Sequence, residues 1–283
     1  MRIGFVGAGK VGFSLGKYMS ERNVCVSGYY SRERESARQA SVLTHSKYYE
    51  TLEEIIESSD ALFLTVPDGA IEDVWNSIKT YSLTGKFICH CSGVMTSAVF
   101  SEIDQMGAFG YSIHPLFAVN SKLQSYQEIS QAFFTIEGSE KHIGYWKDFF
   151  ENLGNPVRLI RADQKVLYHS AAVFVSNLVT GLFETGVDLL MACGFDRESG
   201  ETALKPLFMN NCLSVSRLGA VDALTGPVER ADIKTIEKHL NVLPEREREI
   251  YIRLSEVLAG VAKQKHPERD YDVLMQYLKG MEN

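Results

Sequence analysis

The sequence has few features that would bind a charged polymer or enter a lipid bilayer. Its 283 residues include 29 Lys and Arg against 36 Asp and Glu, which gives a formal net charge of −7. A net-acidic chain repels phosphate backbones and anionic lipids unless it carries a local basic cluster, and no long basic block is present. Apolar runs such as Ala61–Val66 and Ala171–Val175 are far shorter than the ~20 residues that a membrane span needs. We therefore expect no nucleic-acid partner and no membrane partner.

Cysteine is scarce, and its five scattered positions do not suggest a disulfide framework. Such a set in a chain of this length is typical of a reducing compartment, so we expect a cytoplasmic protein. The strand-like start runs directly into Gly7, so we also expect no cleaved leader. Cys89, His90 and Cys91 invite a metal interpretation, but alternation along a strand would place the imidazole opposite the two thiols. We predict a buried strand there and no metal site.

Short β-branched runs alternate with helical stretches over the first half of the chain. This alternation indicates βαβ units, and hence a parallel sheet with helices on both faces. The pattern therefore predicts an α/β fold, with an N-terminal Rossmann doubly wound sheet over residues 1–162. The expected strands are Arg2–Val6, Val24–Tyr30, Ala61–Val66, Lys86–His90, Phe133–Glu137 and Val157–Leu159.

The remaining residues, 163–283, are typical of an all-α C-terminal domain. Apolar residues at helical spacing predict one long helix from Gln164 to Ala192 and a second over Glu198–Leu218, with Pro206 near a kink. Shorter helices over Ile233–Leu240 and Glu245–Gln264 then lead to a polar tail. The long helices are too apolar for a lobe of ~120 residues to cover, which predicts a homodimer formed through this helical domain.

A glycine-rich turn follows the first expected strand and opens the first helix. It has the pattern G-x-G-x-x-G, which is weak alone but specific in this strand–turn–helix context. Gly7 suits the tight turn, Gly9 lets backbone N–H groups reach a pyrophosphate, and Gly12 allows the helix to pack closely on the strand. The turn predicts a dinucleotide site formed by Gly7, Ala8, Gly9, Lys10, Val11 and Gly12.

The end of the second expected strand decides which dinucleotide is favoured. A carboxylate there would bind the ribose 2′-hydroxyl of NAD, but this chain has Ser31 followed by Arg32. A hydroxyl and a guanidinium suit the 2′-phosphate of NADP, so we predict NADP(H) as the cofactor. Glu33 leaves NAD open, because its carboxylate could fold back to a diol. Arg32 could equally belong to a solvated helix start.

Two further segments end strands on the side of the sheet where ligands bind. Val66, Pro67 and Asp68 follow one strand and are predicted to pass beside the cofactor, although Asp68 could also cap the next helix. Ser92 follows the next strand, and His114 lies near the end of the extended run after it.

The start of the first long helix carries an unusual polar face. Lys165 and His169 are spaced i, i+4 and share that face, with Tyr168 beside them. Burial of the amine would lower its pKa toward the working range of a general acid, whereas a solvated first turn would give it no such role.

The chain resembles the β-hydroxyacid dehydrogenase and 6-phosphogluconate dehydrogenase superfamily, which includes ketopantoate and pyrroline-5-carboxylate reductases. It resembles most one uncharacterised branch, in which a Rossmann-like domain precedes a helical domain of unknown function. In the superfamily a lysine and an asparagine four residues later face the nicotinamide; Lys165 matches the lysine, but His169 replaces the asparagine. The stretches that carry the likeness are Gly7–Gly12, Ser92-Gly93, His114–Leu116, Lys165–His169, Ser176-Asn177 and Leu224–Asp232.

The resemblance implies an NADP-dependent reductase of a small keto or imino carboxylic acid, with ketopantoate reduction as the most specific hypothesis. Lys165 would donate the proton, His169 would orient the substrate and Ser92 would hydrogen-bond the oxygen being reduced. His114, Asn177 and Arg230 would contact the substrate, with Arg230 on its carboxylate, although Leu224–Asp232 could instead be only a capped turn. A nicotinamide-dinucleotide sensor or scaffold without turnover remains the alternative.

Overall fold

The computed structural model describes residues 1–122 and 124–281, which form two compact units divided after Ser176. The sequence analysis placed the domain boundary at residue 162. The helix α7 (Lys165–Phe174) lies in the first unit, because the side chain at its start is buried among residues of the sheet. Each unit has its own apolar core and is described separately below.

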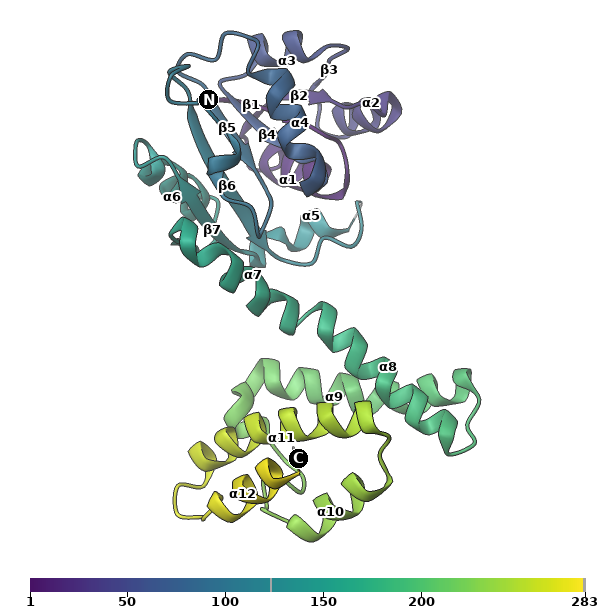
Figure 1. The fold of residues 1–283 in the computed structure, drawn as a ribbon. Coiled ribbons are helices and arrows are strands. Elements are labelled where there is room, and N and C mark those ends of the chain that lie inside the picture. The colour runs from purple at the N-terminus through teal and green to yellow at the C-terminus, as the bar shows by residue number, and fades with distance from the viewer. Residues whose placement is uncertain (123, 282–283) are drawn as a thin grey trace. The chain divides into compact units, whose positions relative to one another are not determined.

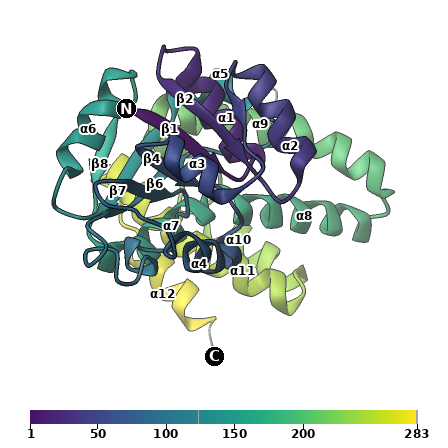
Figure 2. The ribbon, with the colours of Figure 1, turned by 90° about the horizontal axis from the view of Figure 1, so that it is seen from above.

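The first unit is built on one eight-stranded sheet with the order β3-β2-β1-β4-β5-β6-β7-β8 (Figures 1 and 2). All neighbouring strands run parallel except β6 and β7, which are antiparallel. The predicted Rossmann doubly wound sheet is therefore confirmed, with one antiparallel pair toward its far edge. The strands are β1 (Arg2–Val6), β2 (Cys25–Tyr30), β3 (Lys47–Tyr48), β4 (Ala61–Leu64), β5 (Phe87–His90), β6 (Phe109–Leu116), β7 (Phe133–Gly138) and β8 (Val157–Leu159).

Helices cover both faces of this sheet because successive side chains of its central strands point to opposite sides. In β1, Ile3 and Phe5 pack into one buried cluster, while Val6 packs into the other. The first cluster takes side chains from α1, α2 and α6, and the second takes them from α3 and α4. These helices are α1 (Lys10–Ser20), α2 (Arg34–Leu43), α3 (Leu52–Ser58), α4 (Asp68–Ile78) and α6 (Ile143–Asn152); a short α5 (Ser125–Glu128) follows β6.

The second unit is helical, as predicted, but two details of the prediction are wrong. The single helix expected from Gln164 to Ala192 is interrupted at Val175 and Ser176, which form a turn between α7 and α8. The expected polar tail contains a helix, because its Leu274 and Leu278 lie on one face and are buried in the core. The helices are α8 (Asn177–Ala192), α9 (Arg197–Ala223), α10 (Ile233–Val242), α11 (Glu245–Lys265) and α12 (Asp272–Gly280).

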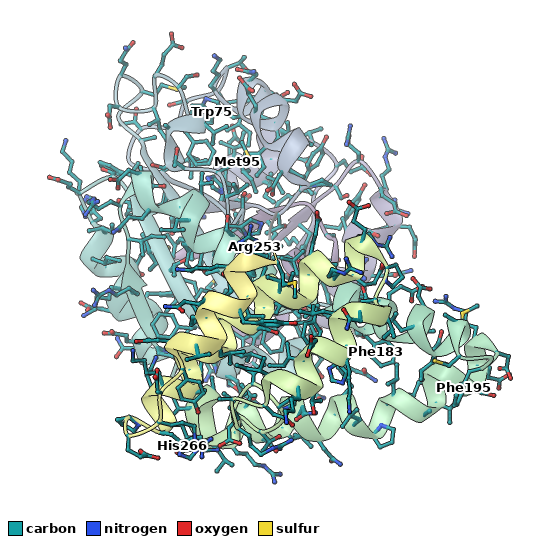
Figure 3. The ribbon with its side chains drawn as sticks, turned by 60° about the horizontal axis from the view of Figure 1, so that its bottom comes forward. Trp75, Met95, Phe183, Phe195, Arg253 and His266 are labelled. Atoms are coloured by element: carbon teal, nitrogen blue, oxygen red, sulfur yellow. The ribbon has the colours of Figure 1, made fainter. Side chains whose placement is uncertain are left out.

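α8 and α9 keep much of their apolar surface outside this core. Phe183 of α8, labelled in Figure 3, meets Phe208 of α9 edge to face with ring centroids 5.2 Å apart. Among the described residues of α8, however, Val187 is the one that is fully buried. Leu207 and Leu218 of α9 expose about 60% of their surface (61% and 60%). One described segment, Ala162–Ala192, has the length and mean hydropathy of a membrane-crossing helix, a test that a packing helix of a soluble protein also meets.

A buried polar hub holds the first unit together and generates a stability prediction. Asn155 accepts a hydrogen bond from the Tyr18 hydroxyl at 2.5 Å and donates to the carbonyls of Ile129 and Ala132 at 2.8 and 3.0 Å. Asn155→Ala should lower the free energy of unfolding by about 3 kcal/mol, because buried groups would lose their partners. Gln39→Ala, which removes an exposed bond to Glu35, should change it by less than about 0.5 kcal/mol. Urea unfolding of both variants checks this, and equal losses would contradict it.

Candidate active site

The glycine-rich turn has the geometry of a phosphate cradle. Gly7 adopts a φ of 107°, and a methyl group there would lie 2.8 Å from the carbonyl oxygen of Thr65. Gly12 is equally restricted, because a methyl group would collide with Thr65 and with the Gly7 carbonyl. At Gly9, by contrast, a methyl group would meet no atom within 4 Å, so its backbone borders open space.

The first turn of α1 suits an anionic group. Gly9 is the N-cap residue and supplies no side-chain cap, and no acidic residue occupies the first turn. The N–H groups at a helix start, with the positive end of the helix dipole, are a ready site for a phosphate. The residues present therefore fit a dinucleotide pyrophosphate.

A cavity of about 260 Å³ lies beside this turn. Its lining includes seven of the eleven residues predicted to bind the cofactor: Gly7, Ala8, Gly9, Ser31, Arg32, Val66 and Pro67. Lys10, Val11 and Gly12 do not line it but form the first turn of α1, and Asp68 begins α4 directly after Pro67. Sequence reasoning missed Thr65, whose hydroxyl donates to the Gly7 carbonyl at 2.8 Å and shapes the turn.

The side chains after β2 bear on the choice of cofactor. The Glu33 carboxylate accepts a hydrogen bond from the Ser36 hydroxyl at 3.1 Å, and the Glu33 N–H donates to the Ser31 hydroxyl at 3.2 Å. Arg32 is exposed and lines the cavity. The Glu33 carboxylate therefore contacts the start of α2, but Glu33 lines the same cavity as Arg32, so both charged side chains border it.

Capping of α4 by Asp68, the alternative that the sequence left open, does not occur. Pro67 occupies the N-cap position, and Asp68 is the first helical residue. Its carboxylate instead accepts a hydrogen bond from the Ser92 hydroxyl at 2.7 Å. The same hydroxyl accepts from the N–H groups of Val94 and Met95 at 3.3 and 3.0 Å. Ser92 thus joins the cavity wall to the loop after β5.

Lys165 is buried at the start of α7, with 1% of its surface exposed. Its ammonium donates to the Ser92 carbonyl at 2.9 Å and to the Ser112 hydroxyl. Burial lowers the pKa of Lys165 from 10.5 to about 8, although the nearby carboxylates of Glu137 and Asp68 oppose this shift. The solvated first turn that the sequence left open is therefore wrong.

Three histidines surround the amine. His90 is buried, with Nδ1 accepting from the Ser92 N–H at 3.2 Å, and burial lowers its pKa to about 4. Burial also lowers the pKa of His114 to about 3, and the nearby charge of Lys165 adds to this effect. The Nδ1 atom of His169 is buried without a hydrogen-bond partner. The structure thus brings together Ser92, His114, Lys165 and His169, four of the predicted site residues.

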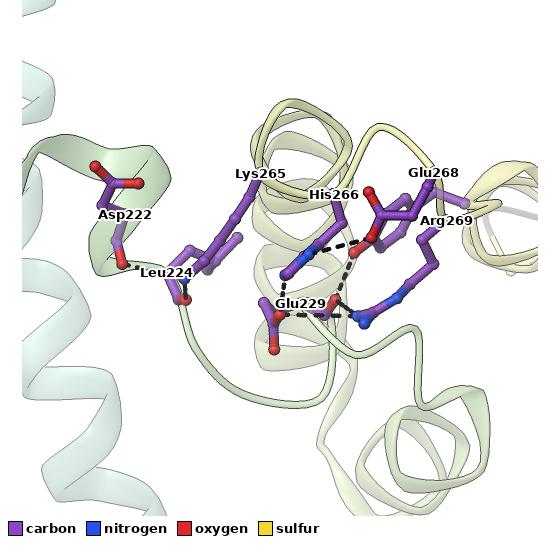
Figure 4. A network of polar contacts seen from close by, with 8 residues as sticks. Asp222, Leu224, Glu229, Lys265, His266, Glu268 and Arg269 are labelled. Atoms are coloured by element: carbon purple, nitrogen blue, oxygen red, sulfur yellow. Dashed lines mark hydrogen bonds and ion pairs between the residues drawn. The ribbon is translucent and has the colours of Figure 1, made fainter.

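The other two predicted substrate residues, Asn177 and Arg230, belong to the helical unit. Arg230 is exposed on the loop between α9 and α10, where Asp232 caps α10 by accepting from the Thr235 N–H at 3.1 Å. Glu229 anchors this loop (Figure 4): its carboxylate contacts His266, and its carbonyl accepts from Arg269 at 2.7 Å. The predicted capped turn is confirmed, and the sequence held no signal for the anchoring role of Glu229.

Comparison with protein-family models gives two matches. A Rossmann-like domain matches residues 1–115, and a domain of unknown function, DUF2520, matches residues 132–257. The predicted order, a Rossmann-like domain before a domain of unknown function, is confirmed. No curated protein matches the chain.

Several solved structures have a similar fold. Protein TM1727 from Thermotoga maritima is 26% identical and covers 93% of this chain and 99% of its own, with a TM-score of 0.73. A pyrroline carboxylate reductase from Plasmodium falciparum, solved with NADP bound, is 14% identical over 94% and 98% of the two chains, with a TM-score of 0.59. A reductive aminase from Aspergillus terreus in complex with NADPH is 14% identical over 98% of each, with a TM-score of 0.61.

The buried amine makes stability depend on pH in a defined direction. The folded-state pKa of Lys165, about 8, lies below its usual 10.5. Between these values the unfolded chain binds more protons at this residue, so the stability of the wild type rises with pH. Relative to Lys165→Met, the wild type should gain on the order of 3 kcal/mol over this window and nothing below it.

Urea unfolding of both proteins from pH 6 to about 10.5 measures this difference. Lys147→Met is the matched control, because the side chain of Lys147 on α6 is partly exposed and pairs with Glu151 at 3.5 Å. If the difference in unfolding free energy between the wild type and Lys165→Met is as independent of pH as the difference for Lys147→Met, the amine keeps its ordinary pKa.

Proposed function

We propose that this protein is an NADP-dependent reductase of a small keto or imino carboxylic acid. The observation that carries the proposal is a continuous set of contacts from the cofactor cavity to a buried amine. Pro67 lines the cavity, Asp68 follows it and accepts from the Ser92 hydroxyl at 2.7 Å, and the Ser92 carbonyl accepts from Lys165 at 2.9 Å. Such a pairing of a dinucleotide site with a group of lowered pKa is typical of a reductase.

The residues of the turn would hold the cofactor in an order set by their chemistry. Gly7, Gly9 and the first turn of α1 would bind the pyrophosphate, and Ser31 with Arg32 would bind the ribose 2′-phosphate. Bound NADPH supplies a hydride to the substrate carbon. Placing the nicotinamide end near Asp68 and Ser92 would bring that carbon within reach of the residues around Lys165.

Lys165 would supply the proton that reduction requires. Reduction of a carbonyl group builds negative charge on its oxygen, and a buried ammonium stabilises that charge where water is excluded. A pKa of about 8 leaves the amine protonated at neutral pH yet able to release its proton, which suits a general acid. His114 and His169 would orient the substrate, and the Ser92 hydroxyl would fix the position of the Asp68 carboxylate. Asn177 and Arg230 are proposed as further substrate contacts, Arg230 through the carboxylate.

The first prediction of the proposal concerns the cofactor. NADPH should bind more tightly than NADH, and Arg32→Ala should reduce the difference, because a charge-assisted hydrogen bond contributes about 1.5–3 kcal/mol. Fluorescence titration of both cofactors with the wild type, Arg32→Ala and Arg158→Ala measures it; Arg158 is an exposed residue of β8 outside the cavity. Equal affinities of the wild type for the two cofactors would contradict the assignment.

The second prediction concerns turnover. A panel of 2-keto acids and cyclic imino acids should oxidise NADPH in the presence of the wild type. Lys165→Ala should lower the rate by about 10²–10⁴, as expected for loss of a proton donor, with NADPH affinity nearly unchanged. Lys147→Ala should behave as the wild type. Tight NADPH binding without turnover on any substrate would instead support the sensor or scaffold.

We also propose a cytoplasmic homodimer formed through the helical unit. Such a dimer would cover the apolar side chains that α8 and α9 leave exposed, such as Leu207 at 61%. Light scattering at micromolar concentration should give the mass of a dimer, and Leu207→Asp should weaken it. Val42→Asp, on α2 of the first unit and 71% exposed, should not. A monomeric wild type would contradict the proposal.

A further inference from the structure

Tyr168, which has no part in the function proposed so far, contacts one of the histidines around Lys165. Its hydroxyl lies 2.7 Å from Nδ1 of His114, and the two rings meet edge to face with centroids 5.6 Å apart. Tyr168 comes from α7 and His114 from β6, so the contact joins the helix to the sheet. Burial raises the pKa of Tyr168, which keeps its hydroxyl protonated at neutral pH.

This contact determines which nitrogen of His114 carries the proton. With a pKa of about 3, His114 is neutral under working conditions, and a neutral imidazole has one N–H group and one acceptor nitrogen. A phenol is a good donor and an unprotonated imidazole nitrogen a good acceptor, so the Tyr168 hydroxyl donates to Nδ1. The proton of His114 then resides on Nε2.

The Nε2 atom of His114 and the Nδ1 atom of His169 face the same point above Gly93. A methyl group on Gly93 would lie 2.9 Å from the former and 2.5 Å from the latter. Glycine is therefore the residue that lets both rings approach, with centroids 6.2 Å apart. The Nδ1 atom of His169 is buried and has no hydrogen-bond partner among the described residues, so its protonation state is set by what faces it on this side.

Two N–H groups directed at one point would repel each other. Because His114 presents Nε2–H there, the neutral form of His169 keeps Nδ1 unprotonated and carries its proton on Nε2. His169 lies one helical turn after Lys165, so this N–H belongs to a residue on the same face of α7 as the amine.

We propose that Tyr168 is a positioning residue that fixes the tautomers of His114 and His169, so that His169 presents Nε2–H to an acceptor oxygen of the substrate. This inference rests on the proposed function for the identity of the ligand, but the tautomers themselves do not depend on turnover. The site then selects a substrate whose carbonyl or carboxylate oxygen accepts a hydrogen bond beside Lys165. A substrate group that can only donate, such as a protonated amine, would offer no acceptor to the Nε2–H group of His169 or to the Lys165 ammonium.

Nitrogen NMR of the full-length protein labelled with ¹⁵N-histidine tests the tautomers directly, with His114→Asn and His169→Asn for assignment. We expect the Nε2–H form for both residues in the wild type at neutral pH. In Tyr168→Phe, His114 should populate the Nδ1–H form and His169 should become a mixture. A matched control is Tyr251→Phe, because Tyr251 contacts Nδ1 of His239 at 2.9 Å in the helical unit; it should change the signals of His239 alone.

An Nδ1–H form of His114 in the wild type would overturn the inference, and this outcome needs no variant to fold. Signals of His114 and His169 that are unchanged in Tyr168→Phe would overturn it as well. With any keto acid that the wild type reduces, Tyr168→Phe should raise KM about three- to tenfold, the size of one hydrogen bond, with NADPH affinity unchanged. If the tautomers are as expected but no substrate is reduced, the proposed function fails and the positioning role stands.

Discussion

The burial of the Lys165 ammonium is the constraint on which the rest of the site depends. Removing a charge from water costs several kcal/mol unless other groups replace its hydration. Among the described residues, the ammonium donates to the Ser92 carbonyl and to the Ser112 hydroxyl, and no carboxylate lies at ion-pair distance from it. Glu137 lies nearby but is held by Ser97, through its N–H at 2.7 Å and its hydroxyl at 2.8 Å. Buried groups with lowered pKa values cluster at functional sites, which is why the proposed function centres on this amine.

The topology of the sheet explains why this amine lies close to the cofactor cavity. β4, β5 and β6 are parallel neighbours, so the loops after their carboxyl ends meet at one edge, the usual ligand side of an open α/β sheet. Pro67 and Asp68 follow β4, Ser92 follows β5 and Ser112 lies within β6. The antiparallel return of β7 places Thr135 opposite His114, and the chain then reaches α7 through β8. The same edge thus carries the dinucleotide cradle, the amine and the histidines.

Local patterns in the sequence predicted the parts of the site that depend on local structure. The glycine-rich turn and the shared face of Lys165 and His169 follow from spacing alone. The burial of Lys165 could not be predicted in this way, because its partners Ser92 and Ser112 lie 73 and 53 residues earlier in the chain. The alternative role of Asp68 as a helix cap could not be judged from the sequence for a similar reason, since its partner, the Ser92 hydroxyl, lies 24 residues away.

The helical unit shows the same limit. The prediction of one helix through Val175 and Ser176 failed because neither glycine nor proline marks the turn between α7 and α8. The polar composition of the last segment concealed a helix, since two leucines four residues apart are enough to bury one face in the core. The fold class, by contrast, followed from the alternation of strands and helices over the first half.

A crystal structure of the NADPH complex would locate the nicotinamide relative to Lys165. We expect the pyrophosphate on Gly7–Gly12, the 2′-phosphate at Arg32, and the nicotinamide next to Asp68 and Ser92, with the substrate space between its C4 atom and the Lys165 ammonium. A nicotinamide directed away from Ser92, or a dinucleotide bound outside the Gly7–Gly12 turn, would contradict this expectation.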